Sequence, residues 1–171
     1  MTTALYLGRF QPFHLGHLDV VKKVAKKYDN VVIAICSAQY SNTMRNPFSY
    51  VERWFMVDGS LKDEGISNYK ILPIPDIHCY EKWAEFCNAI YGDYDVVITN
   101  NPNTRKLFEN RGDKVEGIEP YKILNKVAIS GTLIRDMIAR GNPNWIDCVP
   151  LAVVHILCER NAEGRPGHKI K

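Results

Sequence analysis

The chain has 171 residues, of which 46% are hydrophobic and 24% are charged, and its formal net charge is +3. This length predicts a single domain with a sizeable core, and the composition is that of a soluble globular protein. No apolar run approaches the roughly 20 residues of a membrane span, the amino terminus lacks the plan of a signal peptide, and the charge is too small to indicate a nucleic-acid partner.

Strand-like apolar runs alternate along the chain with helix-like amphipathic stretches. The predicted strands are Thr3–Gly8, Asn30–Ser37, Lys70–Ile74, Asp95–Thr99 and Lys114–Glu119. The predicted helices are Leu15–Lys27, Ser49–Glu64, Glu81–Tyr91, Asn103–Asn110, Gly131–Arg140 and Leu151–Arg160. The alternation predicts an α/β fold with a Rossmann-like, doubly wound parallel sheet of about five strands, in one domain over residues 1–160. A loose polar tail is expected over residues 161–171.

The five cysteines lie at scattered positions and form no Cys-x-x-Cys pair. They are typical of buried thiols in a reduced protein, so we expect a cytoplasmic location. The nearest approach to a metal-binding pattern is the set His78, Cys79 and Cys87, whose spacing fits no structural zinc site. We therefore expect no metal held by a set of protein ligands.

The most informative segment is the loop Gly8-Arg9-Phe10-Gln11-Pro12-Phe13-His14-Leu15-Gly16-His17, which joins the first predicted strand to the first predicted helix. Loops at this point of an open α/β sheet bind ligands, and the dipole of the following helix attracts phosphate. His14 and His17 are three residues apart and share a face of the first helical turn. Gly8 and Gly16 let a ligand approach the backbone. The pattern predicts a phosphate-binding site, and its alternative is two ordinary histidines near a helix start.

A second motif, Ile129-Ser130-Gly131-Thr132-Leu133-Ile134-Arg135, begins the fifth predicted helix. Ser130 or Thr132 can cap this helix, and the first backbone N–H groups of a helix can bind a triphosphate. Arg135 lies one turn further along and can reach the same ligand. The alternative is a plain capping motif, which is common in helical proteins.

The two motifs, His14-x-Gly16-His17 and Ile129-Ser130-x-Thr132-x-x-Arg135, resemble the signatures of the nucleotidyltransferase superfamily. Within it, the chain looks like the archaeal-type nicotinamide-nucleotide adenylyltransferases. Further matching stretches are Ser37-Ala38-Gln39, Arg45-Asn46-Pro47-Phe48, Pro75-Asp76-Ile77, Trp83 and Asn101-Pro102. The resemblance implies transfer of an adenylyl group from ATP to nicotinamide mononucleotide, which gives NAD and pyrophosphate.

The resemblance also implies a role for each matched residue. The catalytic residues would be Arg9, His14, His17 and Arg135, which would hold the phosphates of ATP. Further ATP contacts would come from Gly8, Phe10, Gly16, Asn101, Ser130 and Thr132. The mononucleotide would be bound by Ser37, Arg45, Asp76, Ile77 and Trp83. The sequence does not divide the work between Arg9 and Arg45, since either can lie near the reacting phosphate.

Four of these residues also fit ordinary structural roles. Trp83 shares a stripe of helical spacing with Tyr80, Cys87 and Ile90, which is typical of a buried helix face. The resemblance instead implies that its indole stacks on the nicotinamide ring as a cation–π pair. The corresponding structural roles are a strand-end cap for Ser37, a solvated loop position for Arg45 and a turn for Asn101. The residue before Asn101 is Asn100, at a position where the family often has glycine.

The expected reaction needs no protein nucleophile, because the acceptor phosphate is already ionised near pH 7 and the protein supplies positioning and charge neutralisation. Mg²⁺ would arrive on ATP, held mainly by phosphates and water. Adenylyl transfer to flavin mononucleotide or phosphopantetheine is one alternative, and a non-catalytic nucleotide sensor is another. No Gly-x-Gly-x-x-Gly follows a strand, which disfavours a dehydrogenase. Archaeal relatives suggest a homo-oligomer, with a hexamer as one form, and the choice between nicotinamide and nicotinate mononucleotide is open.

Overall fold

The computed structural model describes residues 1–118, 122–123 and 127–162. The strands are β1 (Thr3–Gly8), β2 (Asn30–Cys36), β3 (Tyr69–Ile74), β4 (Val96–Ile98), β5 (Val115–Glu116), β6 (Lys122–Ile123) and β7 (Val127–Ala128). The helices are α1 (Leu15–Lys27), α2 (Tyr50–Asp63), α3 (Trp83–Tyr91), α4 (Pro102–Arg111), α5 (Gly131–Ala139) and α6 (Leu151–Ala162), with 3-10 turns η1 (Tyr80–Lys82) and η2 (Pro143–Cys148). No helix in these described ranges is long and apolar enough to cross a membrane.

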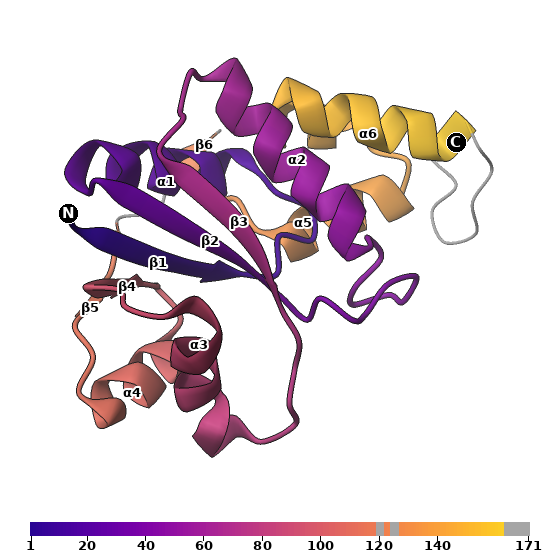
Figure 1. Cartoon of the computed structure of the whole chain (residues 1–171). Coiled ribbons are helices and arrows are strands. Elements are labelled where there is room, and N and C mark those ends of the chain that lie inside the picture. Colours follow the sequence, from indigo (N-terminus) through magenta and orange to yellow (C-terminus); the bar gives the residue numbers. More distant parts are fainter. Residues whose placement is uncertain (119–121, 124–126, 163–171) are drawn as a thin grey trace.

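Five strands form one parallel sheet in the order β3-β2-β1-β4-β5 (Figure 1). The chain winds outward from β1 through β2 to β3, then returns to the other side of β1 to add β4 and β5. The winding direction therefore reverses between β1 and β4. In open α/β sheets, the crevice beyond the carboxyl ends of the strands at such a reversal is the usual ligand site. This topology confirms the predicted fold class.

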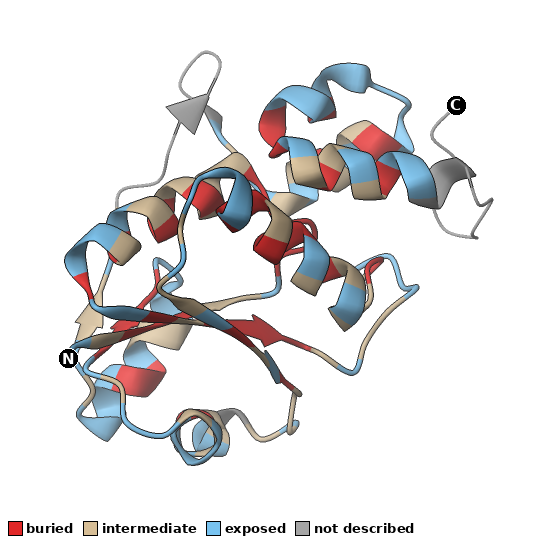
Figure 2. Cartoon of the chain, turned by 45° about the horizontal axis from the view of Figure 1, so that its top comes forward, coloured by how far each residue is buried: buried red, intermediate tan, exposed pale blue. Residues whose placement is uncertain are grey.

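The two faces of the sheet are covered by different helices. Helices α1, α2, α5 and α6 contribute to the apolar cluster on one face, and α3 and α4 contribute to the cluster on the other (Figure 1). Successive side chains of β1 alternate between these clusters: Ala4 and Tyr6 belong to the first, and Leu5 belongs to the second. Burial is concentrated in the sheet and on the helix faces turned toward it (Figure 2). The central strands are continuously apolar because both of their faces are covered.

Local signals explain where the elements begin. Helix α2 begins after a capping box, in which Ser49 Oγ accepts the Glu52 N–H at 3.3 Å and the Glu52 carboxylate accepts the Ser49 N–H at 2.8 Å. Helix α4 begins one residue earlier than predicted, because Pro102 occupies its first position after the Asn101 cap. Both β1 and α1 have the predicted bounds.

Some local features differ from the prediction. The antiparallel pair β6–β7 was not expected, since two-residue strands are too short to show a periodicity. Strand β5 is shorter than predicted, and residue 119 of the prediction lies outside the described residues. Helix α6 continues through Ala162, so the first two residues of the predicted tail are helical, and residues 163–171 lie outside the described ranges.

Candidate active site

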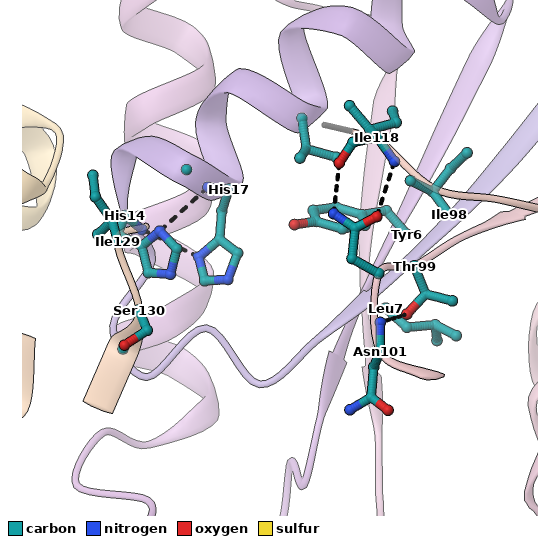
Figure 3. A pocket seen from close by; sticks show the side chains of 14 residues that line it. Tyr6, Leu7, His14, His17, Ile98, Thr99, Asn101, Ile118, Ile129 and Ser130 are labelled. Carbon is teal, nitrogen blue, oxygen red and sulfur yellow. Dashed lines mark hydrogen bonds between the residues drawn. The ribbon is translucent and has the colours of Figure 1, made fainter. Parts of the chain in front are cut away.

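A cavity of about 340 Å³ lies beyond the carboxyl ends of β1 and β4, at the reversal of the sheet (Figure 3). The amino termini of α1 and α5 border it. Its lining consists of Tyr6, Leu7, His14, Gly16, His17, Val20, Ile98, Thr99, Asn100, Asn101, Ile118, Ile129, Ser130 and Gly131. The cavity therefore joins the two sequence motifs to the end of the fourth strand.

His14 and His17 cap the first turn of α1, because the ring of each residue accepts the backbone N–H of the other. The Nδ1 atom of His14 accepts the backbone N–H of His17 at 3.3 Å, and the Nδ1 atom of His17 accepts the backbone N–H of His14 at 3.3 Å (Figure 3). A ring nitrogen that accepts a hydrogen bond carries no proton, so each neutral imidazole carries its proton on Nε2. The cap thus fixes both rings as Nε2–H donors.

Burial keeps these two imidazoles neutral. It lowers the pKa of His14 to about 4. The pKa of His17 is also lowered well below its ordinary value, first by burial and then by His14. The His17 ring lies among aromatic rings, with centroid distances of 4.9 Å to Phe10, 5.6 Å to Phe13 and 6.5 Å to Tyr6. At neutral pH the pair therefore supplies hydrogen bonds rather than positive charge.

Positive charge at the site comes from arginines and helix termini. The first turns of the described helices α1 and α5 carry no acidic residue that would offset their dipoles. The guanidinium of Arg135 donates to the Gln11 carbonyl at 2.7 Å and to the Thr132 hydroxyl at 3.1 Å. Burial lowers the pKa of Arg135, and the positive charge of Arg9 lowers it further. The positive charges of Arg9 and Arg135 are therefore close enough to affect each other.

The cap of α5 is formed by Ser130, whose Oγ accepts the backbone N–H of Leu133 at 3.2 Å. The cap leaves the N–H groups of Gly131 and Thr132, at the first two helical positions, for a ligand. A Cβ atom on Gly131 would lie 2.8 Å from the Gln11 carbonyl oxygen, closer than side-chain carbons come to backbone oxygen. Glycine is therefore required for α5 to approach the first loop.

Two glycines of the first loop lie against aromatic rings of the protein itself. A Cβ atom on Gly8 would lie 2.6 Å from the Phe10 ring, and one on Gly16 would lie 3.1 Å from the His14 ring. Close packing against these rings is therefore one reason for glycine at both positions. Gly16 also lines the first cavity, and the approach of a ligand to this backbone stays a prediction. The Phe10 side chain is only 1% exposed, so any contact of this residue with a nucleotide would come from its backbone.

A second cavity, of about 440 Å³, follows the end of β3 and is lined by Asp76, Ile77, His78, Cys79, Trp83 and Thr104. Trp83 is half-buried and meets Phe108 edge to face, with ring centroids 6.0 Å apart. On the same helix Cys87 is buried, but Ile90 is 42% exposed. The helical stripe is thus only partly buried, and Trp83 borders a cavity.

Asp76 is held in this second cavity by two residues that follow β2. Ser37 donates its hydroxyl proton to Asp76 Oδ2 at 2.8 Å. The Gln39 side chain pairs with the Asp76 backbone, donating to the carbonyl at 2.9 Å and accepting the N–H at 3.0 Å. The hydroxyl of Ser37 is therefore engaged with a carboxylate, and its role in binding the mononucleotide stays a prediction.

The structure divides the predicted site residues into three groups. The first cavity brings together His14, Gly16, His17, Asn101 and Ser130, and the second brings together Asp76, Ile77 and Trp83. The residues that line neither of these two cavities are Gly8, Arg9, Phe10, Ser37, Arg45, Thr132 and Arg135. The side chains of Arg9 and Arg45 are exposed.

The two asparagines after β4 are already engaged with the protein. The Oδ1 atom of Asn101 caps α4 by accepting the N–H groups of Asn103 at 2.9 Å and Thr104 at 3.2 Å. The Asn100 amide pairs with the Ile118 backbone, donating to its carbonyl at 2.5 Å and accepting its N–H at 3.0 Å. Asn100 thus closes one side of the cavity, and Asn101 retains its amide NH₂ for a ligand.

Two buried polar residues that the sequence analysis missed organise the site. Gln11 is 3% exposed, and its side chain donates to the Phe48 carbonyl and accepts the Phe48 N–H, each at 2.9 Å. Arg53 is fully buried in α2. The sequence contains a signal for Arg53, because it lies four and eight residues before the buried Val57 and Leu61 on one helical stripe. A charged residue on an apolar stripe indicates a buried polar role.

A family model described as cytidylyltransferase-like matches residues 5–137 of the chain. Among curated relatives, the nicotinamide-nucleotide adenylyltransferase of Thermoplasma volcanium is 40% identical over 156 residues, which cover 91% of this chain and 85% of the relative. The protein of the same name from Saccharolobus solfataricus is 39% identical over 167 residues, which cover 96% and 95%.

Among solved structures, a bifunctional NMN adenylyltransferase/ADP ribose pyrophosphatase from Francisella tularensis superimposes with a TM-score of 0.74 at 21% identity. The match covers 94% of this chain, which spans only 50% of that two-activity chain. A second structure of that protein, with AMP and a manganese ion, gives a TM-score of 0.70 at 22% identity over 94% and 49% of the two chains. These likenesses support the fold.

Proposed function

We propose, since the chain belongs to the family of nicotinamide-nucleotide adenylyltransferases, that it transfers the adenylyl group of ATP to nicotinamide mononucleotide and releases pyrophosphate. The product of this reaction is NAD. The observation that carries the proposal is the pair of Nε2–H donors, His14 and His17, fixed at the cavity between β1 and β4. Such donors match the charge that develops on the phosphates during adenylyl transfer.

The first cavity would hold the phosphates of ATP. An oxygen of the mononucleotide phosphate attacks the α-phosphorus, and the bond to the bridging oxygen of pyrophosphate breaks, with its electron pair leaving on pyrophosphate. Negative charge then grows on oxygens that the histidines, the amino terminus of α5 and the side chains of Arg9 and Arg135 can meet. The acceptor phosphate is itself the nucleophile, so the protein contributes positioning and charge neutralisation.

The second cavity would hold the nicotinamide ring. Trp83 offers an indole to a cationic pyridinium, and the carboxylate of Asp76, fixed by Ser37 and Gln39, adds negative charge nearby. Arg45 is exposed on the segment between β2 and α2 and would meet the mononucleotide phosphate. Together these residues would suit an acceptor that carries both a cationic ring and an anionic phosphate.

Mg²⁺ would enter with the triphosphate. Among the residues that line the first cavity, the polar side chains are histidines, hydroxyls and amides, which suit phosphate oxygens better than they suit a bare Mg²⁺ ion. In the described ranges there is also no group of three or more His, Cys, Asp or Glu residues that could hold a metal. When bound to ATP, Mg²⁺ neutralises part of the charge on the phosphates. Homo-oligomer formation and a cytoplasmic location stay predictions.

A substrate screen tests the proposal. The purified protein is incubated with ATP, Mg²⁺ and one acceptor at a time: nicotinamide mononucleotide, nicotinate mononucleotide, flavin mononucleotide or phosphopantetheine. The product is identified by mass, and pyrophosphate is measured in parallel. We expect NAD from the first acceptor. Product from flavin mononucleotide or phosphopantetheine alone would replace the proposed acceptor, and nucleotide binding without any product would indicate a sensor.

A further inference from the structure

Arg53 is a fully buried cation whose hydrogen-bond acceptors among the described residues are all backbone carbonyl groups. Its guanidinium donates to the carbonyl oxygens of Cys36 at 2.7 Å, Arg9 at 2.8 Å and Ser37 at 3.1 Å. Its Nε donates to the carbonyl of Ser49 at 3.1 Å. One side chain of α2 therefore joins the loop after β1 to the end of β2.

This arrangement is costly for stability alone. A buried charge loses its hydration, and an apolar side chain of similar volume often stabilises a core as well or better. The planar guanidinium does what an apolar group cannot, because its five N–H donors have fixed directions and can hold several carbonyls at set positions. Burial lowers the pKa of Arg53 to about 10, so the group stays protonated at neutral pH.

Two of the four carbonyls that Arg53 holds, those of Arg9 and Ser37, belong to segments that carry proposed substrate-binding residues. Arg9 carries one of the cationic side chains proposed for the ATP phosphates. The hydroxyl of Ser37 holds Asp76 in the second cavity. The same first loop is held two residues later, where the Gln11 carbonyl accepts from Arg135 and the Gln11 side chain pairs with Phe48. Arg53 thus fixes the loop after β1, which contains Arg9, relative to the segment after β2, which contains Ser37.

We propose that Arg53 is a positioning residue for adenylyl transfer, which acts by holding the backbone of Arg9 and Ser37 so that the two substrate phosphates meet in line. The inference rests on the proposed function. Small errors of alignment between reacting groups lower the rate of the chemical step more than they lower ground-state binding. Loss of the guanidinium fork should therefore affect kcat more than either KM.

The test compares Arg53→Lys, Arg9→Ala and the double variant at a temperature well below every melting temperature. Lysine keeps the charge but not the fork. We expect Arg53→Lys to lower kcat by roughly 10- to 100-fold and each KM to change less than about threefold. In the Arg9→Ala background the same substitution should lower kcat by a smaller factor than in the wild-type background, because one of the two groups that Arg53 positions is gone. The matched control is Leu61→Ala, a fully buried change in the same helix, which should lower the melting temperature and leave kcat at the wild-type value.

If Arg53→Lys does not fold, Arg53→Met replaces it under the same thresholds, because methionine fills the space without a buried charge. A kcat within about threefold of wild type, or equal fold losses in the wild-type and Arg9→Ala backgrounds, would overturn the positioning role. That outcome leaves the proposed function standing as long as the wild-type protein and Leu61→Ala make NAD. Failure of the wild-type protein to make NAD overturns the proposed function instead.

Discussion

The imidazole rings of His14 and His17 stack with their centroids 3.5 Å apart, and the backbone N–H of each residue donates to the Nδ1 atom of the other. The two nitrogens of each ring therefore have different tasks: Nδ1 caps the helix, and Nε2–H is left for the substrate. Amide side chains can separate these tasks, because asparagine places an oxygen near the Nδ1 position and glutamine places its NH₂ near the Nε2 position.

His17→Asn should keep the cap and lose the donor, whereas His17→Gln should keep the donor and lose the cap. We expect kcat to fall by roughly 10² to 10³ in His17→Asn, with a smaller change in KM, and to fall less in His17→Gln. The glutamine variant should lose about 1 kcal/mol of stability with the cap. The measurements are kcat, both KM values and the melting temperature.

The control for this pair is His155→Asn, at an exposed position of α6, which should change neither kcat nor stability. If His17→Asn retained as much kcat as His17→Gln, the Nε2–H group would have no catalytic role. The histidine pair would then be a helix cap and nothing more.

The low pKa of His14 predicts a pH-dependent stability. Burial lowers this pKa from 6.5 to about 4, so the unfolded chain binds the proton first as the pH falls. Neutral His14 therefore contributes fully above pH 6.5, and its contribution declines between pH 6.5 and about 4, by a total on the order of 3 kcal/mol. His14→Asn, which keeps an acceptor for the His17 N–H, should lose less melting temperature than wild type over this range. If the melting temperatures of the two proteins fell by the same amount from pH 7 to pH 4.5, His14 would not titrate in this way.

Gly131→Ala should impair catalysis by displacing α5 from the first loop. The new methyl group would lie 2.8 Å from the Gln11 carbonyl oxygen, which also accepts from Arg135, so the loop or the helix must move. We expect kcat to fall by roughly 10-fold or more. The control is Ala139→Gly at the exposed end of the same helix, which should cost at most about 1 kcal/mol of stability and leave kcat unchanged. An unchanged kcat in Gly131→Ala would mean that this close approach does not matter for the reaction.

The sequence predicted the sheet and the first cavity because their signals are local. The apolar run of β1, the amphipathic stretch of α1 and the loop between them lie within 25 consecutive residues. Helix α5 was placed by its own capping serine. That both helix starts meet at one cavity follows from the parallel sheet, whose carboxyl ends share an edge.

What the sequence did not predict depends on contacts between distant segments. The hydrogen bond from Arg53 to Arg9 spans 44 residues, and the one from Arg135 to Gln11 spans 124. Pairwise contacts of this kind leave no periodicity in the sequence. The same reason explains Gly8, whose role depends on where the Phe10 ring lies after folding.

Trp83 borders the second cavity and also packs against Phe108. A role in substrate binding and a role in the core predict different effects of substitution. If the indole stacks on the nicotinamide ring, Trp83→Phe should mainly raise the KM for the mononucleotide. Trp83→Ala should raise it about 10-fold or more, because a desolvated cation–π contact contributes about 2 kcal/mol. The KM for ATP should hardly change. Binding of the mononucleotide should also quench tryptophan fluorescence in the wild type and not in Trp83→Phe.

If Trp83 were only a core residue, Trp83→Ala would instead cost roughly 3–5 kcal/mol of stability and reduce all kinetic parameters together. The matched control is Trp54→Ala, because Trp54 is a partly buried tryptophan of α2 that packs against the apolar cluster on the opposite face of the sheet. That control should lower the melting temperature without a selective change in the mononucleotide KM. Melting temperature and both KM values are measured on the same preparations. A Trp83→Ala variant that behaves like Trp54→Ala would assign Trp83 to the core. His78 would then be the remaining aromatic residue among those that line the second cavity.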